Sequence, residues 1–215
     1  MYTIPHLIIS EYVSKSIKII NMPQYYLGTI SPDAVHNRAN FIPDMKKDSH
    51  LCVGPEKWGM ITNNDEWKDN ITKFLNKYKG TENNDFILGY CSHILADMYN
   101  NIYLWTPFKQ KNPDAVKTMY NYDDLHHRNG YKTEIELALT YENRNEFWIN
   151  LEKSMSIDLP DIIYRDEIEK QKDNILHLWY KDKSRPDVSP NEIAGTMDTI
   201  KKASEYISDY FKENL

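Results

Sequence analysis

His93 and Asp97 lie four residues apart in an unusually apolar part of the chain. Residues 86–108 read FILGYCSHILADMYNNIYLWTPF, where the carboxylate of Asp97 is the only formal charge, although 27% of all residues are charged. On a helix, residues at i and i+4 project from one face about one turn apart. A buried carboxylate without a partner is costly, whereas a divalent cation stabilises deprotonated oxygen and nitrogen ligands. The spacing fits a metal site, and it fits a simple His–Asp hydrogen bond as well.

Other residues of ligand type precede this pair in the sequence: His6, Asp33, His36 and His50. Each has a plain structural interpretation, because aspartate after proline is common in turns and a histidine beside a serine is often an exposed cap. Their number favours instead a site with nitrogen and oxygen ligands of the zinc type. Asp33 and His36 could also chelate a metal by themselves, so His36 is an alternative to His50.

The order of these residues resembles the zinc-dependent phospholipase C family, which is related to the single-strand-specific zinc nucleases. The pattern is H … LG-x3-PD … SH … GY-x2-H-x3-D, carried by His6, LGTISPD (27–33), SH (49–50) and GYCSHILAD (89–97) within the first 108 residues. The resemblance implies an all-α fold, a cleft with up to three zinc ions, and hydrolysis of phosphodiester bonds by a metal-activated water.

The resemblance also implies a role for each matched residue. The principal zinc would have four ligands: Asp33, His50, His93 and Asp97. His6 would bind a neighbouring ion that Asp97 bridges, and Asp33 would also be the catalytic residue that orients the attacking water.

Three features of the sequence depart from the family pattern. Secreted members begin at a tryptophan whose terminal amine is a ligand, whereas this sequence begins Met1-Tyr2, so we expect that ligand to be missing. Tyr103 stands where the second metal has a histidine. No H-x3-E pair follows, and the residues offered there as additional ligands are His126, His127 and Glu134. We expect one to three zinc ions, with two the best-supported number.

The expected function is that of a zinc-dependent hydrolase acting on a small-molecule or lipid phosphoester. The alternative is a non-catalytic helical module with a structural His/Asp metal site, in which protein ligands would fill every coordination position. A phosphohydrolase of the H…HD…D type ranks below both, because the sequence contains no contiguous His-Asp pair.

Bulk composition limits the partners and the compartment. The net charge of −6 gives no sign of a stable nucleic-acid partner. Cys52 and Cys91 form no CxxC motif, and the first residues lack the features of a signal peptide, so we expect a cytoplasmic protein. Residues 86–108 approach the length of a membrane span, but the polar residues at their middle favour a buried helix and no transmembrane segment.

The elements that must position these residues are helices. Glycine is scarce, at 7 of 215 residues, and apolar residues recur at helical spacing. We expect one all-α domain over residues 1–215, a multi-helix bundle with a long irregular segment at 21–63 that carries Asp33 and His50. The expected helices span 4–20, 65–79, 85–105, 114–121, 131–155, 160–181 and 189–211.

Overall fold

The computed structural model describes every residue except 53, 57 and 113–124, and it describes only the backbone of 125–128. Within that part of the chain the elements are helical, and the only β pairing is an isolated bridge between Leu159 and Ile163. The elements are α1 (Thr3–Ser14), α2 (Met22–Ile30), η1 (Pro32–Asn37), α3 (Met45–Ser49), α4 (Asn64–Tyr78), α5 (Asn84–Asn100), η2 (Asn101–Trp105), α6 (Thr106–Lys111), α7 (Leu125–Thr140), α8 (Arg144–Lys153), α9 (Arg165–Asn174), η4 (Ile175–Trp179) and α10 (Pro190–Asn214). The predicted all-α class is confirmed.

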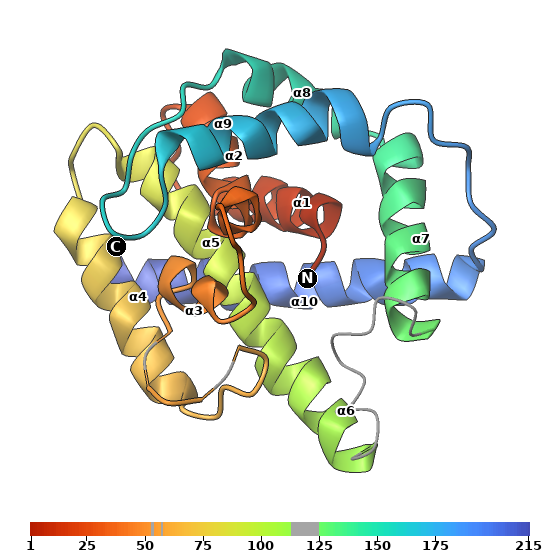
Figure 1. Ribbon diagram of the computed structural model, residues 1–215, viewed down its shortest axis with the longest axis horizontal. Coiled ribbons are helices and arrows are strands. Elements are labelled where there is room, and N and C mark those ends of the chain that lie inside the picture. The colour runs from red at the N-terminus through yellow and green to blue at the C-terminus, as the bar shows by residue number, and fades with distance from the viewer. Residues whose placement is uncertain (53, 57, 113–124) are drawn as a thin grey trace.

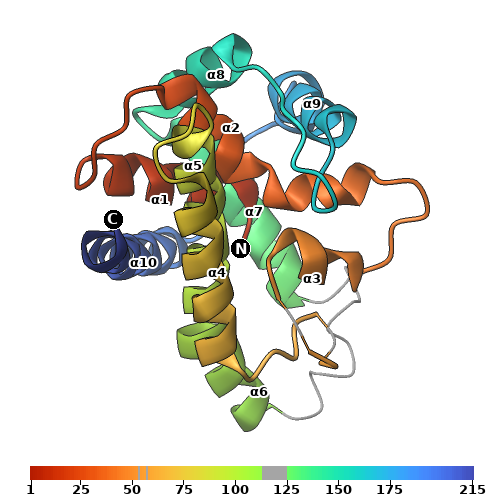
Figure 2. The same cartoon turned by 90° about the vertical axis from the view of Figure 1, so that its left-hand side faces the viewer.

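Helix α5 forms the centre of the molecule, as its apolar sequence predicts. Each of its residues from Asp85 to Met98 is buried. Helices α1, α2, α4 and α10 all pack against it (Figures 1 and 2). The helix continues through one π-helical segment, η2, and then α6, which project together at one end of the molecule. Asp97 therefore lies at a point that several helices enclose.

Two glycines allow α2 and α5 to cross at very short range. A Cβ atom at Gly89 would lie 1.9 Å from the carbonyl oxygen of Tyr25, and one at Gly28 would lie 1.9 Å from that of Phe86. Because both nearest atoms belong to the backbone, neither position leaves room for a side chain. Gly89 thus makes room for a neighbouring helix.

The expectation of an irregular segment over 21–63 is wrong in part, because α2, η1 and α3 lie inside it. The side chain of Asn21 accepts a hydrogen bond from the backbone N–H of Gln24 at 3.3 Å, and Pro23 lies in the first turn of α2. Both are ordinary signals of a helix start. The frequent prolines and glycines of this segment separate short helices instead of preventing them.

The helix expected over 131–155 is interrupted between α7 and α8. The buried carboxylate of Glu11 accepts hydrogen bonds from the hydroxyl of Tyr141 and the side-chain amide of Asn143, each at 2.8 Å. These bonds hold the connection between α7 and α8 against α1, and the chain turns at this connection.

Other boundaries also differ from the expectation. The first helix ends at Ser14, and the helix expected from 160 begins at Arg165. The last helix begins as predicted, with Ser189 and Glu192 forming a capping box. The helix expected over 114–121 lies outside the described residues.

Candidate metal centre

Five of the predicted ligands converge at one place, although they come from four separate elements. His6 lies on α1, Asp33 on η1 and His50 at the end of α3, while His93 and Asp97 lie on α5. Figures 1 and 2 show these elements meeting near the N-terminus. The shortest contacts are His6 Nε2 to Asp97 Oδ1 at 3.3 Å, His50 Nε2 to Asp97 Oδ2 at 3.4 Å and His50 Nε2 to Asp33 Oδ1 at 3.6 Å.

Backbone carbonyls contact two of the imidazoles at Nδ1, the ring nitrogen that points away from the carboxylates. Nδ1 of His93 donates to the carbonyl of Thr29 at 2.8 Å, and Nδ1 of His50 lies 2.9 Å from both the carbonyl of Lys46 and the hydroxyl of Ser49. The Thr29 carbonyl can only accept, so Nδ1 of His93 carries the proton and its neutral ring has the lone pair on Nε2. In both rings Nε2 faces the carboxylates. Hydrogen bonds of this kind orient metal-binding histidines in general.

His6 completes the cluster by stacking on His93. The two rings are parallel within 9°, with their centroids 3.6 Å apart. Buried side-chain atoms of the cluster that make no hydrogen bond among the described residues are both ring nitrogens of His6, Nε2 of His50 and Nε2 of His93. Buried polar atoms usually have partners, so this concentration of unsatisfied atoms indicates a missing one.

Burial and charge together set the protonation of the cluster. Burial, with the Lys46 ammonium, lowers the pKa of His50 to about 4, and burial also lowers the pKa of His93 and of His6. Burial alone would raise the pKa of Asp97, but the positive charge of the terminal amine opposes this effect most strongly, and the pKa is held well below its usual value. At neutral pH the imidazoles are therefore neutral and the carboxylates ionised, which is the state that a divalent cation requires.

The five residues form two overlapping groups of metal-ligand geometry. One is His6, His93 and Asp97, and the other is Asp33, His50 and His93; within each group the ligand atoms lie within 4.8 Å of one another. Imidazole nitrogen and carboxylate oxygen suit zinc and related divalent ions. The residues present therefore fit a metal.

Each carboxylate also faces an ammonium group that sequence reasoning missed. The terminal amine of Met1 lies 2.5 Å from Oδ1 of Asp97, although we expected no amine at the site. Nζ of Lys46 lies 2.6 Å from Oδ1 of Asp33.

The structure keeps the alternative ligands away from the cluster. The side chain of His36 is exposed; its Nδ1 donates to the carbonyl of Asp33, and its ring packs on Phe41. Tyr103 is 52% exposed and packs on Tyr99. Among the described residues, neither belongs to a group of metal-ligand geometry.

Glu134 is buried beside the cluster but has a different role. Its Oε1 accepts hydrogen bonds from the backbone N–H of Ile4 at 3.3 Å and from the hydroxyl of Tyr180 at 2.6 Å, so it caps the start of α1. Burial raises its pKa to about 7. The side chains of His126 and His127 lie outside the described residues.

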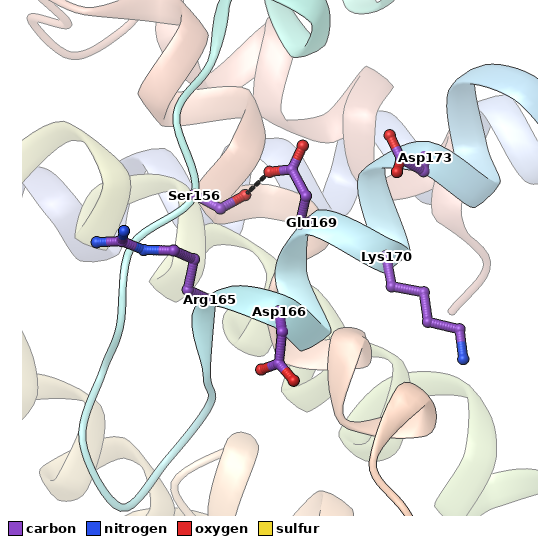
Figure 3. A pocket seen from close by; sticks show the side chains of 6 residues that line it. All are labelled: Ser156, Arg165, Asp166, Glu169, Lys170 and Asp173. Atoms are coloured by element: carbon purple, nitrogen blue, oxygen red, sulfur yellow. Dashed lines mark hydrogen bonds between the residues drawn. The ribbon is translucent and has the colours of Figure 1, made fainter.

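A surface hollow elsewhere lacks comparable chemistry. It has a volume of about 670 Å³ and is lined by Ser156, Arg165, Asp166, Glu169, Lys170 and Asp173 (Figure 3). Its charges are of both signs, and the hydroxyl of Ser156 donates to Glu169 at 2.6 Å. The buried cluster remains the better candidate for a functional site.

Comparison with known proteins adds no constraint. Neither a protein-family model, nor a curated protein, nor a solved structure matches the chain. In the described part of the chain, no helix has the length and apolar character needed to span a membrane.

Proposed function

We propose that this protein is a metal-dependent hydrolase of phosphoric esters, with zinc as the metal. One observation carries the proposal: Nε2 of His50 and Nε2 of His93 are buried without a hydrogen-bond partner among the described residues, although each lies within 3.9 Å of the carboxylates of Asp33 and Asp97. A divalent cation between the nitrogens and the carboxylates would give all of these atoms a partner. The order of the ligands along the chain resembles that of the zinc-dependent phospholipase C family, and this resemblance supplies the ester class.

Each residue would have a distinct task in such a site. His50, His93, Asp33 and Asp97 would hold the principal ion, and His6 with Asp97 would hold a second. A bound zinc would lower the pKa of a water molecule towards neutrality and stabilise charge on phosphoryl oxygens. Asp33 is 15% exposed, the most of the five side chains, whereas His50 is fully buried. The carboxylate of Asp33 would orient the attacking water at the edge of the site that faces solvent.

A structural metal site is the second candidate, because His6 and His93 are almost completely buried. The two candidates differ at one coordination position. A catalytic ion keeps that position for water, while a structural ion has protein ligands only. The partial exposure of Asp33 supports the catalytic alternative.

Metal analysis with matched variants tests the proposal. Protein purified without added zinc should contain about one to two equivalents of metal by mass spectrometry, and it should hydrolyse a chromogenic phosphodiester or phosphomonoester. His93→Ala and Asp97→Ala should each lose metal and activity. His177→Ala, an exposed histidine outside the cluster, should keep both, and His36→Ala should do the same. Unchanged metal content in the first two variants would show that the metal site is wrong.

A further inference from the structure

Lys46 contacts the cluster through its backbone carbonyl and through its side-chain ammonium. Its backbone carbonyl lies 2.9 Å from Nδ1 of His50, and its ammonium lies 2.6 Å from Oδ1 of Asp33. The same ammonium lies 4.7 Å from the ring centroid of Trp58, which packs on His50 at 4.5 Å. The side chain is only 13% exposed. A carboxylate and an aromatic face therefore hold this cation at the rim of the site.

The charges at the cluster balance before any metal is added. Asp33 and Asp97 contribute two negative charges, while Lys46 and the terminal amine contribute two positive ones. A divalent cation would add positive charge to this buried site. Added positive charge attracts an anion, because screening by solvent is weak there.

The position of Lys46 decides where that anion would bind. A metal ion and the ammonium would share the same carboxylate, Asp33, and the Asp33 side of the cluster is its most exposed side. An anion bound there would contact the metal through one oxygen and Lys46 through another. Lysine is a common point-charge ligand for phosphate.

We propose that Lys46 is the anion-binding residue of this site: once metal binds Asp33, its ammonium pairs with a non-bridging phosphoryl oxygen. The inference rests on the proposed function and adds a substrate class to it, namely phosphoric esters that carry a negative charge. Lys46 then selects anionic mono- and diesters against neutral triesters.

Three variants and one non-catalytic ligand test this role. Zinc content is measured by mass spectrometry, and the binding of inorganic phosphate to the zinc-loaded protein is measured by calorimetry. Lys46→Met should keep the zinc stoichiometry and bind zinc more tightly, because a competing cation is removed. Its phosphate dissociation constant should rise by about tenfold or more, the typical effect of losing a hydrogen bond between charged groups.

Two controls separate this effect from a general loss of charge. Lys46→Arg should keep phosphate binding within about threefold, since the charge remains. Lys47→Met removes the adjacent lysine, whose ammonium bonds the Gly54 carbonyl at 2.6 Å, and it should leave phosphate binding unchanged. Lys46→Gln replaces the Met variant if circular dichroism shows that the latter is unfolded.

The outcomes distinguish the two proposals. A wild-type protein that takes up no zinc overturns the proposed function and this role with it. A zinc-loaded protein whose phosphate affinity is the same in wild type and Lys46→Met overturns the role of Lys46 alone. Equal losses of phosphate affinity in Lys46→Met and Lys47→Met also overturn it, because the effect would then be a general one of charge.

Discussion

Replacing Gly89 by alanine would force α2 and α5 apart beside His93, which belongs to the candidate metal centre. The added methyl carbon would lie 1.9 Å from the carbonyl oxygen of Tyr25, while real Cβ atoms essentially never approach closer than 3.0 Å. The backbone of α2 must then move by at least 1.1 Å, the difference between these distances. No flexible side chain can absorb this movement.

Two opposing contributions set the change in stability. Forcing extra volume into a packed core costs about 1–3 kcal/mol, and contact with backbone places Gly89→Ala at the upper end of that range. Alanine recovers about 1 kcal/mol through its higher helix propensity. We expect the free energy of unfolding in urea, measured with chelator present, to fall by about 2 kcal/mol.

The same movement should weaken metal binding. Nδ1 of His93 donates to the Thr29 carbonyl on α2 at 2.8 Å, and a shift of about 1 Å would break that bond. Loss of such a supporting hydrogen bond typically costs about 10- to 100-fold in metal affinity. Competition with a chromophoric chelator measures this for zinc.

Gly195→Ala provides the matched control. Gly195 lies on the exposed face of α10, and a Cβ atom there would meet nothing within 4 Å. This variant should be more stable by about 0.5–1 kcal/mol and bind zinc normally. If Gly89→Ala were as stable as Gly195→Ala, the close crossing would be refuted. If Gly89→Ala lost stability but kept its zinc affinity, the Thr29 carbonyl would have no role in positioning His93.

Three further perturbations test other parts of the structure. Burial raises the pKa of Glu134 from 4.5 to about 7, so the folded state binds a proton that the unfolded state releases. Relative to Glu134→Gln, wild-type stability should therefore fall by about 3 kcal/mol as the pH rises from 4.5 to above 7, and urea titrations showing no such trend would contradict the assignment. Chelation should lower the melting temperature by roughly 8–15 °C if zinc is present at about 1,000 times its Kd, and His93→Ala should be insensitive to chelator. Arg38 donates to both carboxylate oxygens of buried Glu167, at 2.6 and 3.0 Å, so Arg38→Met should cost about 3 kcal/mol and Arg38→Met/Glu167→Gln less; equal losses in the single and double variants would refute the coupling.

Local signals in the sequence predict most of the architecture. The apolar run around Asp97 predicts a buried helix, and Ser189 with Glu192 predicts the start of α10. The cap of α2 at Asn21 is also a local signal, but the prolines of this segment favoured the prediction of an irregular segment instead. The break between α7 and α8 at residues 141–143 has no such local signal. It depends on Glu11, more than a hundred residues away, and no local pattern predicts that contact.

The histidines and aspartates that cluster in the structure could be singled out from residue type and order, whereas the ammonium groups beside them could not. A histidine or an aspartate in an apolar stretch is conspicuous, because burying a polar or charged side chain costs free energy unless it has a partner. Lys46 lies in a run of charged residues, and such runs are usually solvated. Only the fold shows that its ammonium turns inwards to Asp33 while the adjacent Lys47 bonds a loop carbonyl.

The geometry of His93 also argues against one of the two interpretations that its spacing from Asp97 allows, the simple hydrogen bond. A simple His–Asp hydrogen bond needs a proton on Nε2, but the neutral ring has its proton on Nδ1, where the Thr29 carbonyl accepts it. The distance from Nε2 to Asp97 Oδ2 is 3.7 Å, too long for a hydrogen bond. Protonating both nitrogens would supply the missing donor, yet burial holds the pKa of His93 well below its usual value. The structure therefore contains no hydrogen bond between His93 and Asp97, and the proposed metal ion would give Nε2 of His93 the partner that it lacks.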